Sequence, residues 1–195
     1  MEEGMATGAA LYFLAMARNN AWANHRLLQA CKGLSAAEFT AERTSFFPSI
    51  VATYNHILVV DWFYVDALEG GTLGPKAWEN EIPFPNFGDF DAAQRGVDRR
   101  LIALCSGLDD EKLAAEIRMH RASHVQFDRA DRVLLHLFEH QIHHRGQIHA
   151  MLAGSPVKPP QLDEFFCAGD AKFRADDMVA LGWTEEDVWR GLDGR

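Results

Sequence analysis

The sequence predicts an all-α protein built around a four-helix bundle. Apolar residues recur at helical spacing in four long segments, and a glycine lies close after the end of each segment. The chain has 195 residues, of which 48% are hydrophobic and 24% charged, which is enough for one globular domain with a sizeable core. Four long helices with connections of this length are typical of a bundle.

The first long helix is expected at residues 11–31, because its apolar residues keep helical spacing and Gly33 follows. Ser35 and Glu38 then form a capping box, in which each side chain binds the backbone N–H of the other residue. This pair predicts a short helix or turn directly after the first long helix.

The second long helix is expected to open at Pro48 and Ser49 and to end at Gly70. The following segment, 71–89, is rich in glycine, proline and asparagine, so no long element fits inside it. The third long helix is expected at residues 90–105.

A short β-hairpin is expected between the third and fourth long helices. Ile117 and Met119 alternate with polar residues, and Val125 and Phe127 do the same. A period of two is typical of strands, so we expect the chain to turn near residues 121–123.

The fourth long helix is expected at residues 129–152, and a tail with short helices around 163–168 and from Thr184 follows it. We therefore divide the chain into a bundle domain, residues 1–168, and a C-terminal tail, residues 169–195, with a short helix packed on the bundle.

The composition argues against several classes of partner. The formal net charge is −9, which repels nucleic acid and anionic membrane surfaces. The N-terminal segment lacks the features of a signal peptide, and no apolar run approaches the ~20 residues that span a bilayer. The three cysteines are widely spaced and form no CxxC motif. Reduced thiols in the cytoplasm are the expected reading.

Histidines are concentrated in the fourth helix, in the segment FEHQIHHRGQIH at residues 138–149. His140 and His144 lie one turn apart, about 40° from each other around the helix axis. His136, His143 and His149 lie about 60°, 80° and 160° from the centre of the same stripe. The stripe has the spacing of a core-facing seam and consists of Val133, Leu137, His140, His144, Gln147 and Met151.

One histidine interrupts a similar stripe in the second helix, formed by Ser49, Ala52, His56, Val59, Phe63 and Ala67. Burying three imidazoles without partners costs on the order of 1–3 kcal/mol each. A divalent metal resolves this cost, since neutral imidazole is a strong ligand for zinc and nickel and also suits iron or manganese. Three ligands leave a coordination position open, as a catalytic site requires.

Other interpretations of the three core-facing histidines stay open. They could be hydrogen-bonded core residues that hold no metal. A zinc-protease HExxH motif is excluded because Gln141 follows the first histidine, and the Glu-x-x-His pairs of ferritin-like sites do not occur.

The chain resembles the DinB (damage-inducible) family of bacterial proteins over about residues 9–168. The final-helix signature, a histidine and three residues followed by His-Arg-Gly-Gln, is matched at residues 140–147, and an N-terminal Asn-x-x-Trp-x-Asn segment at residues 19–24. A Phe-Phe-Pro-Ser segment followed by Asn-His is matched at Phe46–Ser49, Asn55 and His56, and a Leu-Asp-Glu-Phe-Phe tail at Leu162–Phe166.

The resemblance implies a bundle with crossover topology, commonly dimeric, that holds a divalent metal through three histidines. The ligand positions fall on His56, His140 and His144. His136, His143 and His149 match no ligand position of the family. Relatives include metal-dependent thiol S-transferases that use a low-molecular-weight thiol.

Several other residues have predicted roles. Gln147 is expected to bind a ligand imidazole or a metal-bound water. Asn55, Trp22 and Phe63 are expected near the ligands, in the pocket or in the packing around it. Gly146 is expected to let another helix approach closely, and Arg145, off the stripe, to pair with a carboxylate.

Two functions follow as hypotheses, and no catalytic residue is assigned in either. The first is a metal-dependent enzyme, of thiol S-transferase or hydrolase type, that acts on a small molecule. The second is a non-catalytic metal-binding stress-response protein.

Overall fold

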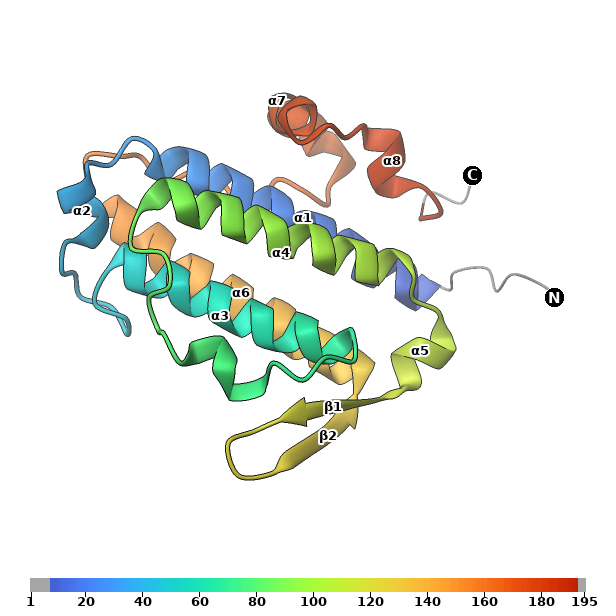
Figure 1. The fold of residues 1–195 in the computed structure, drawn as a ribbon. Helices are drawn as coiled ribbons and strands as arrows, with labels where there is room; N and C mark the ends of the chain where they lie inside the picture. The colour runs from blue at the N-terminus through green and yellow to red at the C-terminus, as the bar shows by residue number, and fades with distance from the viewer. Residues whose placement is uncertain (1–7, 193–195) are drawn as a thin grey trace.

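The computed structural model describes residues 8–192, in which four long helices form the bundle (Figure 1). They are α1 (Gly8–Cys31), α3 (Ile50–Leu68), α4 (Phe87–Ser106) and α6 (Ala130–Ala153). α1 packs against α4 and α6, and α3 packs against the same two helices, so α1 and α3 occupy diagonal corners. α3 and α4 run in the same direction, and the segment between them returns along the bundle (Figure 1). The predicted all-α bundle with a crossover connection is confirmed.

Shorter elements connect and extend the bundle. They are α2 (Ala36–Thr40), the 3-10 helix η1 (Gly74–Trp78), α5 (Asp110–Ala114), β1 (Glu116–His120), β2 (Val125–Arg129), the 3-10 helix η2 (Ala168–Asp170), α7 (Ala171–Leu181) and α8 (Glu185–Trp189). The strands form an antiparallel hairpin in which Glu116 faces Arg129 and His120 faces Val125. The predicted hairpin between the third and fourth long helices is therefore confirmed.

Local capping explains where several helices begin. The Ser35 hydroxyl accepts a hydrogen bond from the Glu38 N–H, and the Glu38 carboxylate accepts one from the Ser35 N–H. The Ser49 hydroxyl accepts a hydrogen bond from the Ala52 N–H at the start of α3, and the Thr184 hydroxyl accepts one from the Asp187 N–H at the start of α8. These side chains satisfy backbone donors that a helix leaves unpaired in its first turn. The three starts were predicted because their signals are local.

One predicted boundary and one predicted helix are displaced. α4 begins at Phe87 rather than near residue 90, and its N-cap Asn86 makes no side-chain capping bond. Residues 163–167 are not helical, and the structure has α7 further along instead. α7 buries Arg174 and Met178 among its eleven residues, so its sequence carries little apolar periodicity.

The hairpin packs against α3 and the start of α6. Met119 of β1 is 1% exposed and lies in a cluster with Phe63, Ala77 and Val133. Gly74 opens η1 with a φ of +53°, and a Cβ at this position would lie 2.9 Å from the Cβ of His120. Glycine is needed here for both backbone conformation and space.

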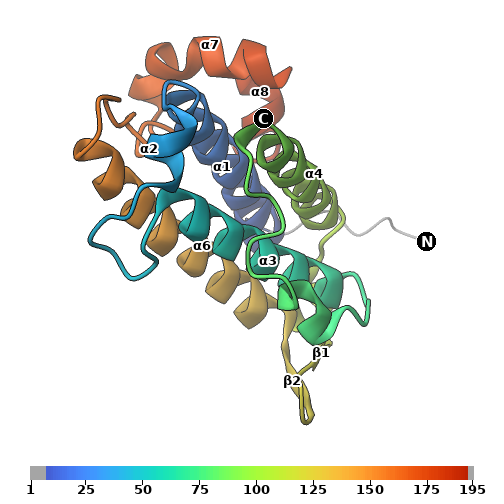
Figure 2. The same cartoon turned by 60° about the vertical axis from the view of Figure 1, so that its left-hand side comes forward.

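The C-terminal helices cover α1 on the side away from the hairpin, as both views show (Figures 1 and 2). Trp22 of α1 is fully buried there with Phe165, in a cluster that also contains Met178 and Val188. Arg26 Nε lies 2.6 Å from an Asp177 carboxylate oxygen, which also accepts a hydrogen bond from the Trp22 indole. The tail is thus held on the bundle by a small apolar cluster and charged hydrogen bonds.

The described part of the chain was searched for membrane-spanning helices and for the state of its cysteines. No helix within residues 8–192 is both long and apolar enough to cross a bilayer. Cys31 and Cys105 are buried free thiols, and Cys167 is an exposed one.

Candidate metal centre

Three histidines from two helices converge at one edge of the bundle. His56 comes from α3, and His140 and His144 come from successive turns of α6. One ring nitrogen from each lies within 4.8 Å of the others, and His56 Nε2 is 3.0 Å from His140 Nε2. The spacing of four residues on α6 and the packing of α3 against α6 bring the rings together.

The rings lie beneath the loop that precedes α3. The Phe47 ring centroid is 4.2 Å from that of His56 and 5.5 Å from that of His144. His56 and His140 are half-buried, and His144 is 7% exposed. Phe47 therefore shields the imidazoles of His56 and His144 from water on one side.

The environment keeps the three imidazoles neutral. Burial, with a contribution from the His144 ring, lowers the pKa of His56 to about 4. Burial and then the neighbouring imidazoles lower the pKa of His140 to about 3. Burial also lowers the pKa of His144. Neutral imidazole is the form that binds metal ions, and it predominates here at pH 7.

Gln147 fixes the orientation of His144. Its side-chain oxygen lies 2.8 Å from His144 Nδ1, and because an amide oxygen only accepts, Nδ1 carries the proton. The lone pair of His144 is then on Nε2. The amide nitrogen of Gln147 lies 3.1 Å from His143 Nε2. A partner that fixes the second ring nitrogen is the usual companion of a ligating histidine.

The other histidines of α6 lie outside the cluster. His143 is exposed and touches the site through Gln147, while His136 is exposed and packs against Tyr64 at 5.2 Å between ring centroids. His149 Nε2 is 2.9 Å from the carbonyl oxygen of Pro160, on the linker after α6. Helical phase thus sorts five histidines of one helix into two that converge and three that do not.

The donor set fits a divalent metal. At a Zn–N distance of about 2.1 Å, tetrahedral geometry places ligand nitrogens about 3.4 Å apart. The observed nitrogens bracket this spacing, from 3.0 Å to at most 4.8 Å. His140 Nδ1 is buried without a hydrogen-bond partner among the described residues, so the surrounding side chains leave one ring nitrogen of the cluster unsatisfied. The cluster found in residues 8–192 offers three side chains that could bind a metal, and three ligands would leave a coordination position open.

Three residues predicted near the ligands contact other parts of the fold. Asn55 is fully buried and holds the connection before α4, since its amide binds both the N–H and the carbonyl oxygen of Phe84. Trp22 lies in the tail cluster on α1. Phe63 packs against Trp78, with ring centroids 4.8 Å apart, and contacts this ring instead of the three histidines. Gly146 is exposed, and a Cβ there would meet no atom within 4 Å, so its predicted role in a close helix approach is wrong.

The centre of the bundle holds a polar network that the sequence analysis missed. Most residues of the two predicted inward stripes are buried, and the buried face of α6 is wider than predicted, since it also includes Gln141 and Arg145. Asp61 of α3 and Asp98 of α4 complete the network, and both are fully enclosed. Arg145 was expected to pair with a carboxylate from off the stripe, and it is 4% exposed among these groups.

Amide side chains join the charges of this network. Gln94 donates to Asp61 at 2.9 Å and to Asp98 at 3.2 Å, and Gln141 donates to Asp61 at 2.8 Å. Arg145 donates to the side-chain oxygens of Asn20 and Asn24, whose amide groups donate to Asp98. The segment at residues 19–24 thus contributes to the core through Asn24, the last asparagine of the motif, and through Asn20, which is not one of the motif positions.

Burial raises the pKa of Asp61 to about 7, and the charge of Asp98 adds to this effect. A carboxyl with a raised folded-state pKa binds its proton more tightly in the folded protein, so stability falls as pH rises from about 4 through about 7. Asp61→Asn removes this titration, and Gln94 and Gln141 each have a side-chain oxygen free to accept from the new amide. We expect its stability gain over wild type to grow between pH 5 and pH 8.

Urea midpoints of the metal-free proteins at both pH values measure this gain. The histidine titrations are common to wild type and variant and cancel in the difference. A gain that is the same at pH 5 and pH 8 would show that Asp61 stays ionised in the fold.

The comparisons with known proteins agree with this architecture. A family model described as the DinB family matches residues 5–172. A DinB-like protein from Bacillus cereus ATCC 10987 is similar at 14% identity and a TM-score of 0.58, over 75% of this chain and 94% of that one. A DinB-like protein from Bacillus subtilis is similar at 15% identity and a TM-score of 0.53, over 75% and 96%. A comparison with curated protein sequences found no match.

Proposed function

Because the chain belongs to the DinB family, we propose that it binds a divalent metal ion through His56, His140 and His144 and transfers a small thiol to an electrophilic substrate. The observation that carries the proposal is the convergence of three neutral imidazoles from two helices, with one coordination position open. Zinc or nickel suits this donor set best, and iron or manganese is also compatible with it.

The side chains around the site have distinct tasks in this proposal. His140 and His144 offer two nitrogens from one rigid helix, and His56 offers the third from α3. Gln147 holds the His144 proton on Nδ1, which leaves Nε2 free to bind. Phe47 packs on the rings of His56 and His144 and limits access of water to them from the loop side.

A bound divalent ion supplies Lewis acidity, which lowers the pKa of a coordinated thiol from its usual value of about 8.5. In the transfer, the thiol sulfur forms a bond to an electrophilic carbon, the leaving group departs with its bonding electrons, and the thiol proton goes to solvent. Asp61 and Asp98 lie in the bundle centre and bind amide side chains, so we assign them no part in this step.

The experiment is an assay of metal-loaded protein with small thiols and an electrophile such as a chlorodinitrobenzene. We expect thiol conjugation well above that of the His56→Ala, His140→Ala, His144→Ala triple variant. Equal rates for the two proteins, with metal bound only to wild type, would contradict the catalytic proposal and leave a metal-binding protein without turnover. Hydrolysis of an ester in place of thiol transfer would redirect the proposal to a hydrolase.

We further propose that the protein forms a homodimer through an apolar face on α1 and α6. Tyr12, Leu135 and Ile142 are 67%, 61% and 52% exposed. A shallow depression of about 390 Å³ lies between these helices, and Phe13, Leu135, Phe138 and Ile142 are among the residues that line it. Large apolar side chains grouped on one face are typical of an interface between subunits.

Leu135→Glu combined with Ile142→Glu is expected to convert a dimer into a monomer, because a two-fold interface would then bury four new carboxylates. Light scattering coupled to size-exclusion chromatography measures the mass. Val179→Glu is the control, since Val179 is an equally apolar and 81% exposed side chain on α7. A dimer that survives the double substitution would place the interface elsewhere.

We also propose a cytoplasmic location and a small-molecule substrate. The three free thiols suit a reducing compartment, and the formal charge of −9 disfavours nucleic acid as a ligand.

A further inference from the structure

A cavity of about 490 Å³ opens directly beside His56, at the edge of the candidate metal centre. α3 forms one wall, the loop before α3 a second, and the connection between α3 and α4 a third. The lining residues are Phe47, Pro48, Ala52, His56, Val59, Val60, Trp78, Glu81 and Ile82. A molecule in this cavity would lie against one of the three imidazoles.

The walls suit an apolar body. Valine, isoleucine, proline and two aromatic rings make up most of the lining, and Trp78 is held in place by Phe63, with ring centroids 4.8 Å apart. Pockets of this size and composition bind small molecules mainly through apolar surface, with a few polar groups that set orientation.

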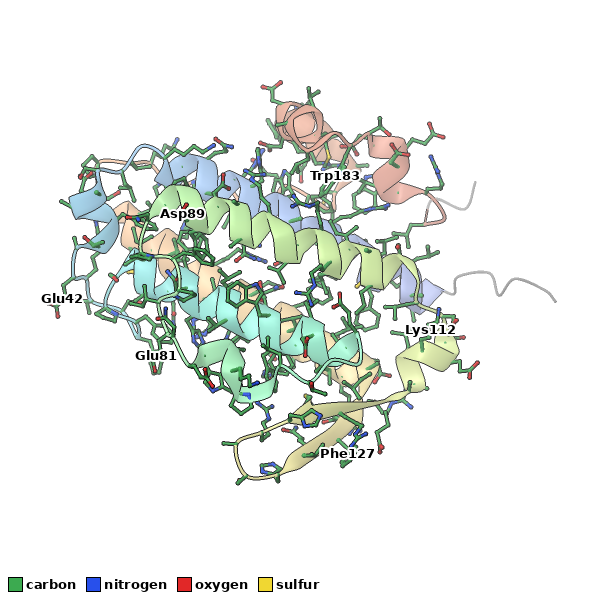
Figure 3. All side chains as sticks on the ribbon, in the orientation of Figure 1. Glu42, Glu81, Asp89, Lys112, Phe127 and Trp183 are labelled. Atoms are coloured by element: carbon green, nitrogen blue, oxygen red, sulfur yellow. The ribbon has the colours of Figure 1, made fainter. Side chains whose placement is uncertain are left out.

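Charge around the cavity favours a cation. Among the described residues that line it, Glu81 is the one acidic side chain, and no lysine or arginine accompanies it. Glu81 makes no ion pair with any residue in the described range 8–192. It lies on the connection after η1, beside α3 (Figure 3). The aromatic rings of Phe47 and Trp78 also attract cations through their π faces.

We propose that this cavity binds an apolar molecule that carries an amine, with the apolar body against Val59 and Trp78 and the ammonium group paired with Glu81. As a statement about the substrate it rests on the proposed function, because it takes the cavity to be the substrate side of the metal centre. The net charge of −9 adds to the preference, since it disfavours anionic molecules throughout the surface.

The test compares three probes that share a phenyl ring and differ in charge: 2-phenylethylamine, 2-phenylethanol and 3-phenylpropionate. Binding to metal-loaded and to metal-free protein is measured by NMR, with the Trp78 indole signal assigned through Trp78→Phe. We expect the amine to shift this signal and to bind about tenfold more tightly than the carboxylate, since attraction to one exposed charge is replaced by repulsion.

Matched variants separate the contributions. Glu81→Gln is expected to bring the amine to the affinity of the alcohol, and Ala52→Leu, which fills part of the cavity, to weaken all three probes. Glu79→Gln is the control, because Glu79 is an exposed carboxylate two residues away that does not line the cavity. Direct coordination of the amine to the metal would survive Glu81→Gln, so it is distinguished from pairing with Glu81.

The proposal is overturned if the carboxylate binds as tightly as the amine, if no probe moves the Trp78 signal, or if Glu81→Gln keeps the preference for the amine. Metal content is measured on the same samples by elemental analysis. A protein that binds no metal but shows Glu81-dependent amine binding would refute the proposed function and retain the amine site. Bound metal without amine preference would do the reverse.

Discussion

Replacing His140 by alanine is expected to weaken metal affinity by more than about 100-fold, since loss even of a partner of a ligand costs about 10–100-fold. His140 contacts both other candidate ligands, with its Nε2 3.0 Å from that of His56 and its ring centroid 4.4 Å from that of His144. After the substitution only two of the three imidazole nitrogens remain to bind the metal. His144→Ala is expected to have an effect of the same size.

Competition with a chelator and elemental analysis of protein without a histidine tag measure this loss. His149→Ala is the matched control, because His149 is on the same helix but contacts the carbonyl oxygen of Pro160. It should retain the metal stoichiometry and affinity of wild type. If His140→Ala keeps the wild-type metal content, the assignment of the three ligands is wrong.

Thermal unfolding gives an independent view of the same site. A ligand that binds the folded state alone stabilises it by about 4 kcal/mol at a free concentration near 1,000 times its Kd. Wild type and His149→Ala should therefore unfold at a higher temperature when metal is added, and the rise should be at most about a third as large in His140→Ala. An equal rise in all three proteins would point to metal binding elsewhere on the chain.

The histidines could be found from the sequence because a helix converts spacing into direction. Four residues separate His140 from His144, which places them on one face whatever the rest of the fold does. The predicted face was too narrow, since the buried surface of α6 also holds Gln141 and Arg145. Apolar periodicity does not reveal these two residues, because they are polar side chains in the bundle centre.

In the rest of the fold, too, features set by sequence neighbours were predictable and features set by distant contacts were not. The helix caps and the hairpin were predictable because Ser35, Ser49 and the alternating strand residues act on their sequence neighbours. α7 was not, because its order comes from distant partners. Arg174 is fully buried and pairs with Glu185 at 2.8 Å, and Phe165 packs on Trp22 of α1. Contacts across the tail decide what residues 163–181 become, and a single sequence gives no sign of them.

Arg145→Met is expected to lower the free energy of unfolding by about 3–5 kcal/mol at pH 8, as removal of one partner from a buried charge network does. Arg145 is the cation near both Asp61 and Asp98, and its charge lowers the pKa of each carboxyl against the larger effect of burial. Without it, Asp61 loses the cation that lowers its pKa, Asp98 keeps the half-buried Arg95 as a neighbouring cation, and the side-chain oxygens of Asn20 and Asn24 lose a donor.

The pH dependence separates this charge effect from a simple packing defect. Asp61 and Asp98 already have pKa values raised to about 7 and about 6, and loss of the cation raises them further. At pH 5 both carboxyls can accept protons and become neutral, so the loss of stability from Arg145→Met should be smaller at pH 5 than at pH 8. Urea unfolding at the two pH values measures this loss of stability. The control is Arg132→Met, which changes an exposed arginine of the same helix and should stay near wild type.

Adding Asp98→Asn to Arg145→Met should recover part of the loss at pH 8, because it removes the carboxylate that the arginine neutralises. A loss that is equal at both pH values and insensitive to Asp98→Asn would mean that Arg145 stabilises the bundle through its packing and not through its charge.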